Sequence, residues 1–278
     1  ASLHKLGLDG QPVLLDVPRS QALLKPLQLP YVEDHRELPT MVRYQVEPEL
    51  PFDVNEAVID FTVESHAEAA DTGEGEGQAT MPVLVAAVRQ SVVDQYRKIA
   101  AAGDFKLCQL GLRPYADTRC LEACLTDDER TQTLALVHVN ADEVEINIVT
   151  RGVLAFSRSA RIKATVPEPS EESQGEAEAP PPAPRRSAAD RDALVVEVVR
   201  TLQSAAAVLS GVRVEGVYIA GDTADEHLIA EALSNRLKVA CNVLEPVGTL
   251  KIKRAKTDGR GFITALGLAI GHGRGDRV

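Results

Sequence analysis

The chain has 278 residues, of which 44% are hydrophobic and 26% are charged, so it is long enough for one large or two ordinary folded domains. Its formal net charge of −11 at pH 7 argues against a nucleic-acid groove, because neutralising phosphates requires clustered Lys and Arg. Only 4% of residues are aromatic and Trp is absent, so the core must be built from Ala, Val, Leu and Ile.

Strand and helix patterns alternate along the first 165 residues. Apolar runs of strand length predict strands at 12–17, 22–29, 57–64, 81–88, 106–112, 133–139, 143–149, 153–157 and 159–162. Helical spacing predicts helices at 33–46, 91–102 and 118–125. The acidic, glycine-containing stretch 71–77 is expected to be a hairpin loop.

Residues 166–188 differ in composition, because Pro, Glu, Ala and Ser replace almost every large apolar residue. This composition predicts a disordered linker whose replacement by Gly and Ser leaves the melting temperature nearly unchanged. Beyond it we expect helices at 190–209, 226–238 and 262–270 and strands at 216–220 and 240–244. The alternation predicts an α/β protein with a mixed sheet and helices on both faces.

The four cysteines, Cys108, Cys120, Cys124 and Cys241, lack the paired spacing of a metal site. So few cysteines in a chain of this size indicate reduced thiols and a cytoplasmic protein. No apolar run of about 18 residues is present, and the first ten residues do not have the layout of a signal peptide, so the chain is not expected to cross a membrane.

Six stretches match a known family in order: 13–30, 46–65, 83–103, 138–159, 217–246 and 265–271. Their shared points are Pro51-Phe52 followed by Asp60, Arg158 after a hairpin, Gly221 after a buried strand, and Ala265-Leu266-Gly267. In these features the chain resembles a divergent member of the type IV pilus assembly protein PilM family. That family belongs, with the cell-division protein FtsA, to the actin-like ATPase fold, which is α/β and ribonuclease H-like.

The resemblance implies a division of the chain into subdomains. The first core subdomain would comprise 1–23 and 106–130, an inserted lobe of the FtsA type 24–105, and the second core subdomain 131–165 and 189–278, with the disordered linker at 166–188. The family's N-terminal phosphate hairpin would precede residue 1 and is missing from the chain.

By the same resemblance, the nucleotide site is degenerate. The second phosphate hairpin, Asp-x-Gly in the family, falls on His138 and Asn140: His138 is no hard-oxygen ligand for magnesium, and Asn140 adds a side chain where phosphate should lie. Asp142 is a nearby carboxylate that either replaces the missing Asp or lies in a turn. Gly221 still permits a backbone approach to adenosine. Asp222 either places negative charge near the phosphates or caps a helix. No catalytic residue or metal ligand is predicted.

The resemblance therefore implies a cytoplasmic scaffold at the inner face of the inner membrane, in a type IV pilus or type II secretion-like assembly. It would bind the N-terminal tail of a PilN-like inner-membrane partner in a groove between core sheet and lobe, hydrolyse no ATP and need no cofactor. It would contact other pilus or secretion components, the membrane only indirectly, and no nucleic acid. Two alternatives remain: an active PilM-like ATPase, using ATP and magnesium, whose first phosphate loop lies outside this chain, or the cytoplasmic domain of a GspL-type secretion protein.

Overall fold

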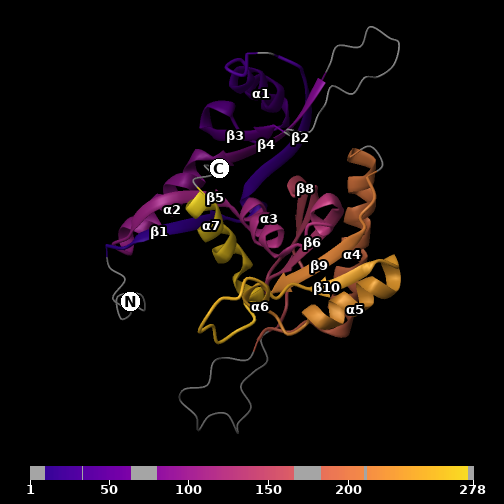
Figure 1. The fold of residues 1–278 in the computed structure, drawn as a ribbon. Helices are drawn as coiled ribbons and strands as arrows, with labels where there is room; N and C mark the ends of the chain where they lie inside the picture. Colours follow the sequence, from indigo (N-terminus) through magenta and orange to yellow (C-terminus); the bar gives the residue numbers. More distant parts are fainter. Residues whose placement is uncertain (1–9, 33, 64–79, 166–182, 210–211, 275–278) are drawn as a thin grey trace, which may run out of the picture. The chain divides into compact units, whose positions relative to one another are not determined.

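The computed structural model describes residues 10–32, 34–63, 80–165, 183–209 and 212–274 (Figure 1). The described residues fall into two compact units, one ending at Arg113 and the other running from Pro114 to Arg274. The subdomains predicted from the sequence have other boundaries, and that finer division stays a prediction.

The first unit contains two separate sheets. Its strands are β1 (Pro12–Val17), β2 (Ala22–Pro30), β3 (Ala57–Val63), β4 (Thr80–Arg89) and β5 (Lys106–Leu112), and its helices are α1 (Leu38–Val46) and α2 (Gln90–Ala102). Short 3-10 helices lie at Arg19–Gln21, Glu47–Glu49 and Val54–Glu56. Strand β1 pairs with β5 in parallel, and β2, β4 and β3 form an antiparallel sheet in that order. Helix α2 follows β4 of the antiparallel sheet and precedes β5 of the parallel pair, so it connects the two sheets along the chain.

Helix α1 covers one face of the three-stranded sheet. Its residues Leu38, Val42 and Val46, spaced four apart, form one apolar face and are buried. They pack with Met81 and Val83 of β4. These two residues are two positions apart in the strand, so their side chains point to the same face of the sheet. A second cluster, centred on Val17 of β1 and Val88 of β4, joins the two sheets of this unit.

The second unit is built on one five-stranded sheet. Its strands are β6 (Thr133–Val139), β7 (Val144–Thr150), β8 (Val153–Ala160), β9 (Gly216–Gly221) and β10 (Ala240–Val243). Its helices are α3 (Arg113–Cys124), α4 (Ala188–Val208), α5 (Glu226–Leu237), α6 (Pro246–Thr249) and α7 (Ile263–Arg274), with 3-10 helices at Glu129–Thr131 and Arg260–Phe262. The strand order is β10-β9-β6-β7-β8: β6, β7 and β8 form an antiparallel meander, whereas β9 runs parallel to both β6 and β10.

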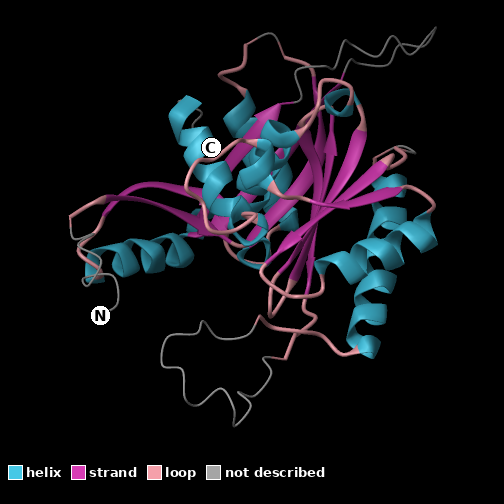
Figure 2. Ribbon diagram, turned by 60° about the horizontal axis from the view of Figure 1, so that its bottom comes forward, coloured by secondary structure: helices cyan, strands magenta, loops and turns pink. Residues whose placement is uncertain are grey.

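Helices cover both faces of this sheet (Figure 2). Val137 and Val139 of β6 face a cluster with α4 and α5, whereas Leu134 and Leu136 face a cluster with α3 and the start of α7. Strand β6 is buried along its whole length. A strand buried on both faces reads in sequence as a continuous apolar run, which is the pattern that predicted it.

Most predicted elements are present, although several differ in extent. Helix α3 begins at Arg113 rather than 118, because Pro114 fits the first turn of a helix, where its missing N–H costs nothing. Helix α1 begins at Leu38 rather than 33, again with Pro in its first turn. The two strands predicted at 153–157 and 159–162 are one strand, β8. The predicted hairpin loop at 71–77 lies outside the described residues.

The predicted disordered linker, 166–188, ends too late. Residues 166–182 lie outside the described part, but Thr165 and Arg185 form an antiparallel bridge, and α4 already begins at Ala188. Ser187 caps this helix, because its hydroxyl accepts a hydrogen bond of 3.1 Å from the backbone N–H of Asp190. Arg186 is only 3% exposed, so a charged residue of the predicted linker is buried in the second unit.

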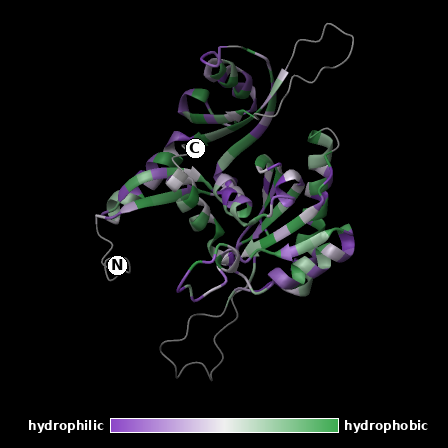
Figure 3. Cartoon of the chain, in the orientation of Figure 1, coloured by the Kyte–Doolittle hydropathy of each residue, from purple (hydrophilic) through white to green (hydrophobic). Residues whose placement is uncertain are grey.

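None of the described helices is both long and apolar enough to cross a membrane. Figure 3 shows polar and apolar stretches mixed along α4, the longest of them.

Candidate functional site

Two neighbouring parallel strands of the second unit end side by side. Val139 at the end of β6 is paired with Gly221 at the end of β9, so Asn140 and Asp222 leave the sheet next to each other. Ligands of α/β proteins bind at the carboxyl ends of parallel strands, where loops and helix N-termini meet. We therefore take this edge, with the turn after β6 and the loop from β9 to α5, as the candidate site.

Gly221 is required at this edge by the close approach of two backbones. A Cβ atom at this position would lie 2.1 Å from the carbonyl oxygen of Val139 and 2.9 Å from Oε1 of Glu226. Real Cβ atoms essentially never lie within 3.0 Å of another non-bonded heavy atom, so a side chain at residue 221 would clash with the backbone of Val139. Gly221 is predicted to permit a close backbone approach to adenosine. In the structure, the close approach that it permits is to the backbone of Val139.

His138 is the second-last residue of β6, and its side chain faces inward, toward α3. Its side chain is buried, and its Nδ1 lies 2.6 Å from Oδ2 of Asp117, which is fully buried. Oδ1 of Asp117 accepts a second hydrogen bond of 2.6 Å from the hydroxyl of Thr264 on α7. The aspartate therefore ties β6, α3 and α7 together, and His138 serves this internal network.

The small residues of α7 make this network possible. A Cβ atom at Gly267 would lie 1.7 Å from the carbonyl oxygen of Ala116, so α7 crosses α3 with their backbones in direct contact. Thr264 lies one turn earlier on the same face of α7, within reach of Asp117. The close packing at Gly267, in the Ala-Leu-Gly stretch noted in the sequence, thus brings the hydroxyl of Thr264 to the carboxylate of Asp117.

The turn after β6 contains Asn140 and Asp142, two of the predicted site residues. The N–H of Asn140 donates to the carbonyl oxygen of Glu143 at 2.9 Å, which closes the turn. The amide nitrogen Nδ2 of Asn140 is buried without a hydrogen-bond partner among the described residues. Asp142 is exposed at the tip of the turn. The structure thus places Asp142 in the turn, one of its two predicted positions.

Arg186 holds this turn from the other side. Its Nη2 donates to the carbonyl oxygens of Asn140 and Ile162, at 2.5 and 2.7 Å, and its backbone N–H donates to Oδ2 of Asp225 at 2.6 Å. Burial lowers the pKa of the guanidinium, and the carboxylates of Asp225 and Glu226 oppose that shift. An arginine stays protonated in either case, so a fixed positive charge lies at the strand ends.

Two buried carboxylates begin α5. Oε1 of Glu226 accepts hydrogen bonds from the backbone N–H and the hydroxyl of Thr223, at 2.8 and 2.7 Å, and its Oε2 lies 3.7 Å from Nε of Arg260. Asp225 lies 3.5 Å from Nη1 of Arg191, besides its contact with the backbone of residue 186. Acidic groups at a helix N-terminus are favoured by the helix dipole. Asp222 remains exposed in the loop before them.

Four of the five predicted site residues thus lie around one edge, and His138 is turned away from it. Sequence analysis missed Asp117, Arg186 and Glu226. The spacing of Thr223 and Glu226, a Thr followed three residues later by Glu, is the signature of a helix start and signals the role of Glu226. Nothing local distinguishes Asp117 or Arg186, because their partners are distant in the sequence.

Comparisons with known proteins agree on one family. The sequence model of the family described as type IV pilus assembly protein PilM matches residues 2–163. Among solved structures, the PilM-PilN type IV pilus biogenesis complex matches with a TM-score of 0.70 and 20% identity, over 96% of this chain and 80% of that chain. This likeness confirms the predicted α/β fold of the actin-like class.

A further solved structure is more distant. A Bacteroides thetaiotaomicron protein of actin-like ATPase fold and unknown function matches with a TM-score of 0.43 and 7% identity, over 86% of this chain and 72% of that chain. No curated protein matches the chain.

Proposed function

This chain belongs to the PilM family of type IV pilus assembly proteins, and from that membership we propose that it is a scaffold that binds a PilN-like partner and hydrolyses no ATP. The observation that carries the proposal is the likeness to the PilM-PilN complex, which extends over 96% of the chain. The partner would be an inner-membrane protein whose N-terminal tail reaches the scaffold at the cytoplasmic face, where other pilus or secretion components assemble.

The residues at the strand ends fit a magnesium-phosphate group poorly, which supports the absence of hydrolysis. His138 is engaged by Asp117 inside the protein, and the carbonyl oxygen of Asn140 is engaged by Arg186. Asp222 presents a negative charge at the exposed part of the loop, where it would repel phosphate. A phosphoryl-transfer site needs metal-held phosphates and donors directed at them. Here the hydrogen bonds that the Arg186 guanidinium forms are directed at backbone carbonyl oxygens of the protein.

The tail would bind to the first unit, between its parallel strand pair and its antiparallel sheet. Half-buried apolar side chains gather at the junction of these sheets, among them Tyr96 of α2 and Leu110 of β5. An extended tail can add its backbone to a sheet edge and place alternate side chains on such a surface. Neither interaction requires a bound nucleotide, so we propose that the protein has no cofactor.

The proposal is tested with a synthetic peptide of the PilN-like partner's cytoplasmic N-terminal tail and the full chain, by calorimetry without nucleotide. Binding is expected, and Tyr96→Ala is expected to weaken it by about tenfold because an aromatic contact is lost. Ile99→Ala is the matched control, since Ile99 lies one turn further along the same helix and is 53% exposed outside the junction cluster. Equal binding by both variants would exclude this junction as the tail site.

Hydrolysis is measured separately with ATP and magnesium, and we expect no turnover above background. Steady turnover that disappears on changing Asp142 or Asp222 to Ala would overturn the scaffold proposal and favour the active-ATPase alternative. Peptide binding that appears only after nucleotide is added would have the same consequence, because the scaffold is proposed to bind in its absence.

A further inference from the structure

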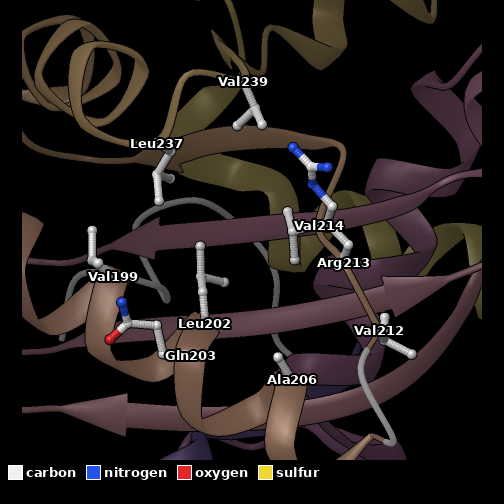
Figure 4. Close-up of a pocket in the computed structure, with 9 residues that line it drawn as sticks. All are labelled: Val199, Leu202, Gln203, Ala206, Val212, Arg213, Val214, Leu237 and Val239. Carbon is white, nitrogen blue, oxygen red and sulfur yellow. The ribbon is translucent and has the colours of Figure 1, made fainter.

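An apolar pocket of about 290 Å³ opens on the second unit (Figure 4). The last turns of α4 line one side with Val199, Leu202 and Ala206, and residues 212–214 with residues 237 and 239 line the rest. Seven of the nine lining side chains are aliphatic, and the exceptions are Gln203 and Arg213. The volume lies at the lower limit of ligand pockets, so it accommodates one or two side chains and no large cofactor.

The pocket is distinct from the candidate site. Residues 212–214 lead into β9, and residues 237–239 lead from α5 into β10, so the pocket lies at the amino ends of these parallel strands. The candidate site lies at their carboxyl ends, beyond Gly221. With six residues in β9 and a rise of about 3.3 Å per residue, the two places are separated by the length of the strand.

The apolar surface continues along α4 beyond the pocket. Val196 lies three residues, or nearly one turn, before Val199 and is 47% exposed, so it extends the apolar lining onto the outer face of the helix. Valine is a poorer helix former than the alanines that follow it in α4, so helix stability does not explain its place on an exposed face. Contiguous apolar surface with a polar rim is typical of interaction sites.

Two exposed cations lie in or next to the pocket lining, although the chain as a whole carries −11. Arg213 lines the pocket, and Lys238 lies between the lining residues Leu237 and Val239; both are exposed. Neither takes part in a side-chain hydrogen bond or ion pair within the part of the chain that the structure describes. An aliphatic pocket beside two cations without partners matches a ligand that combines apolar and acidic groups.

We propose that this pocket docks a short acidic segment of a partner protein, with one aliphatic side chain in the pocket and flanking carboxylates at Arg213 and Lys238. This goes beyond the tail binding proposed for the first unit and does not depend on it. A peptide supplies both groups on one side, because side chains two positions apart in an extended segment point the same way. Exposed cations bind such a segment weakly and with strong dependence on salt, so the aliphatic contact supplies most of the affinity.

The test uses a fluorescein-labelled ten-residue peptide of Leu, Asp and Glu, with fluorescence anisotropy on the full chain. Arg213→Glu is expected to weaken binding about tenfold, whereas Arg236→Glu, an exposed charge outside the lining, is expected to change it by less than about twofold. Ala206→Trp is expected to abolish binding by filling the pocket. Its matched control is Ala207→Trp, the next residue of the helix, which is exposed and does not line the pocket.

Several results would overturn the proposal. They are no binding up to about 1 mM peptide, equal binding of a peptide in which Lys replaces the acidic residues, and binding that Ala206→Trp leaves unchanged. Self-association of the chain that Ala206→Trp abolishes would also overturn it, since the occupant would then be a second copy. Circular dichroism of each variant confirms folding, and Arg213→Glu, a surface change, keeps the test decisive if Ala206→Trp fails to fold.

Discussion

Replacing Arg186 by Met tests whether the end of the Pro-rich segment is an integral part of the second unit. Met keeps much of the length and apolar stem of the side chain but removes its charge and its donors. The carbonyl oxygens of Asn140 and Ile162 then lose the guanidinium that now binds both. Asp225 keeps the backbone N–H of residue 186 and its contact with Arg191.

Arg186→Met lowers the free energy of unfolding through the loss of these hydrogen bonds. Each backbone carbonyl left buried without a donor costs about 1–3 kcal/mol, and the removal of a buried charge recovers part of the desolvation that lowers the pKa of Arg186. A net loss of about 3 kcal/mol in the free energy of unfolding follows. For a protein of this size that loss lowers the melting temperature by roughly 6–12 °C.

The assay is urea denaturation of the full chain, followed by circular dichroism, with Arg185→Met as the control. Arg185 is the adjacent arginine, and its side chain is exposed, so its replacement is expected to change stability by less than about 0.5 kcal/mol. If Arg186→Met and Arg185→Met unfold at the same urea concentration, Arg186 does not hold the turn, and the original assignment of 183–188 to a disordered linker stands.

Two further changes test the helix crossing and one acidic group. Gly267→Ala places a Cβ atom 1.7 Å from a carbonyl oxygen of α3 and is expected to destabilise the protein by about 3 kcal/mol or more in thermal denaturation, whereas Gly273→Ala, with nothing within 4 Å, is expected to be neutral or stabilising. Hydrogen bonds from Thr126 and Tyr218 lower the pKa of Glu129 below its ordinary value of 4.5, so its contribution to stability is present above pH 4.5 and is lost as the pH falls through the lowered pKa. Glu129→Gln should therefore flatten the decrease in stability below pH 4.5; an unchanged slope would contradict this assignment.

Several short apolar strands could be predicted from the sequence almost to the residue. The segments at 12–17, 106–112 and 133–139 are bounded by polar or turn residues and coincide with β1, β5 and β6. Helix starts were less predictable. The helix predicted at 33–46 has Pro39 in its interior, whereas in the structure Pro39 lies in the first turn of α1, where its missing N–H costs nothing. The strand order could not be predicted, since it depends on long-range pairing that leaves no local pattern.

The candidate site was predictable in position but not in its contacts. The resemblance to the PilM family implied a site at His138 to Asp142 and at Gly221 and Asp222, and these residues lie around the carboxyl ends of β6 and β9. The partners of Arg186 are 24, 39 and 46 residues away, and those of Asp117 lie 21 and 147 residues away. Composition assigns an arginine in a Pro-rich segment to solvent, because burying its charge requires acceptors that only the folded chain brings together.

The two ends of β9 differ in a way that bears on function. At its carboxyl end, the guanidinium of Arg186 binds backbone carbonyl oxygens, and the carboxylates that begin α5 face other arginines, so these charges already have contacts within the protein. At its amino end, the aliphatic pocket and the unpaired charge of Arg213 have no such partners among the described residues. Binding of another protein is favoured where it buries exposed apolar surface and pairs an exposed charge. The amino end of β9 is therefore the place where we propose that a partner protein binds.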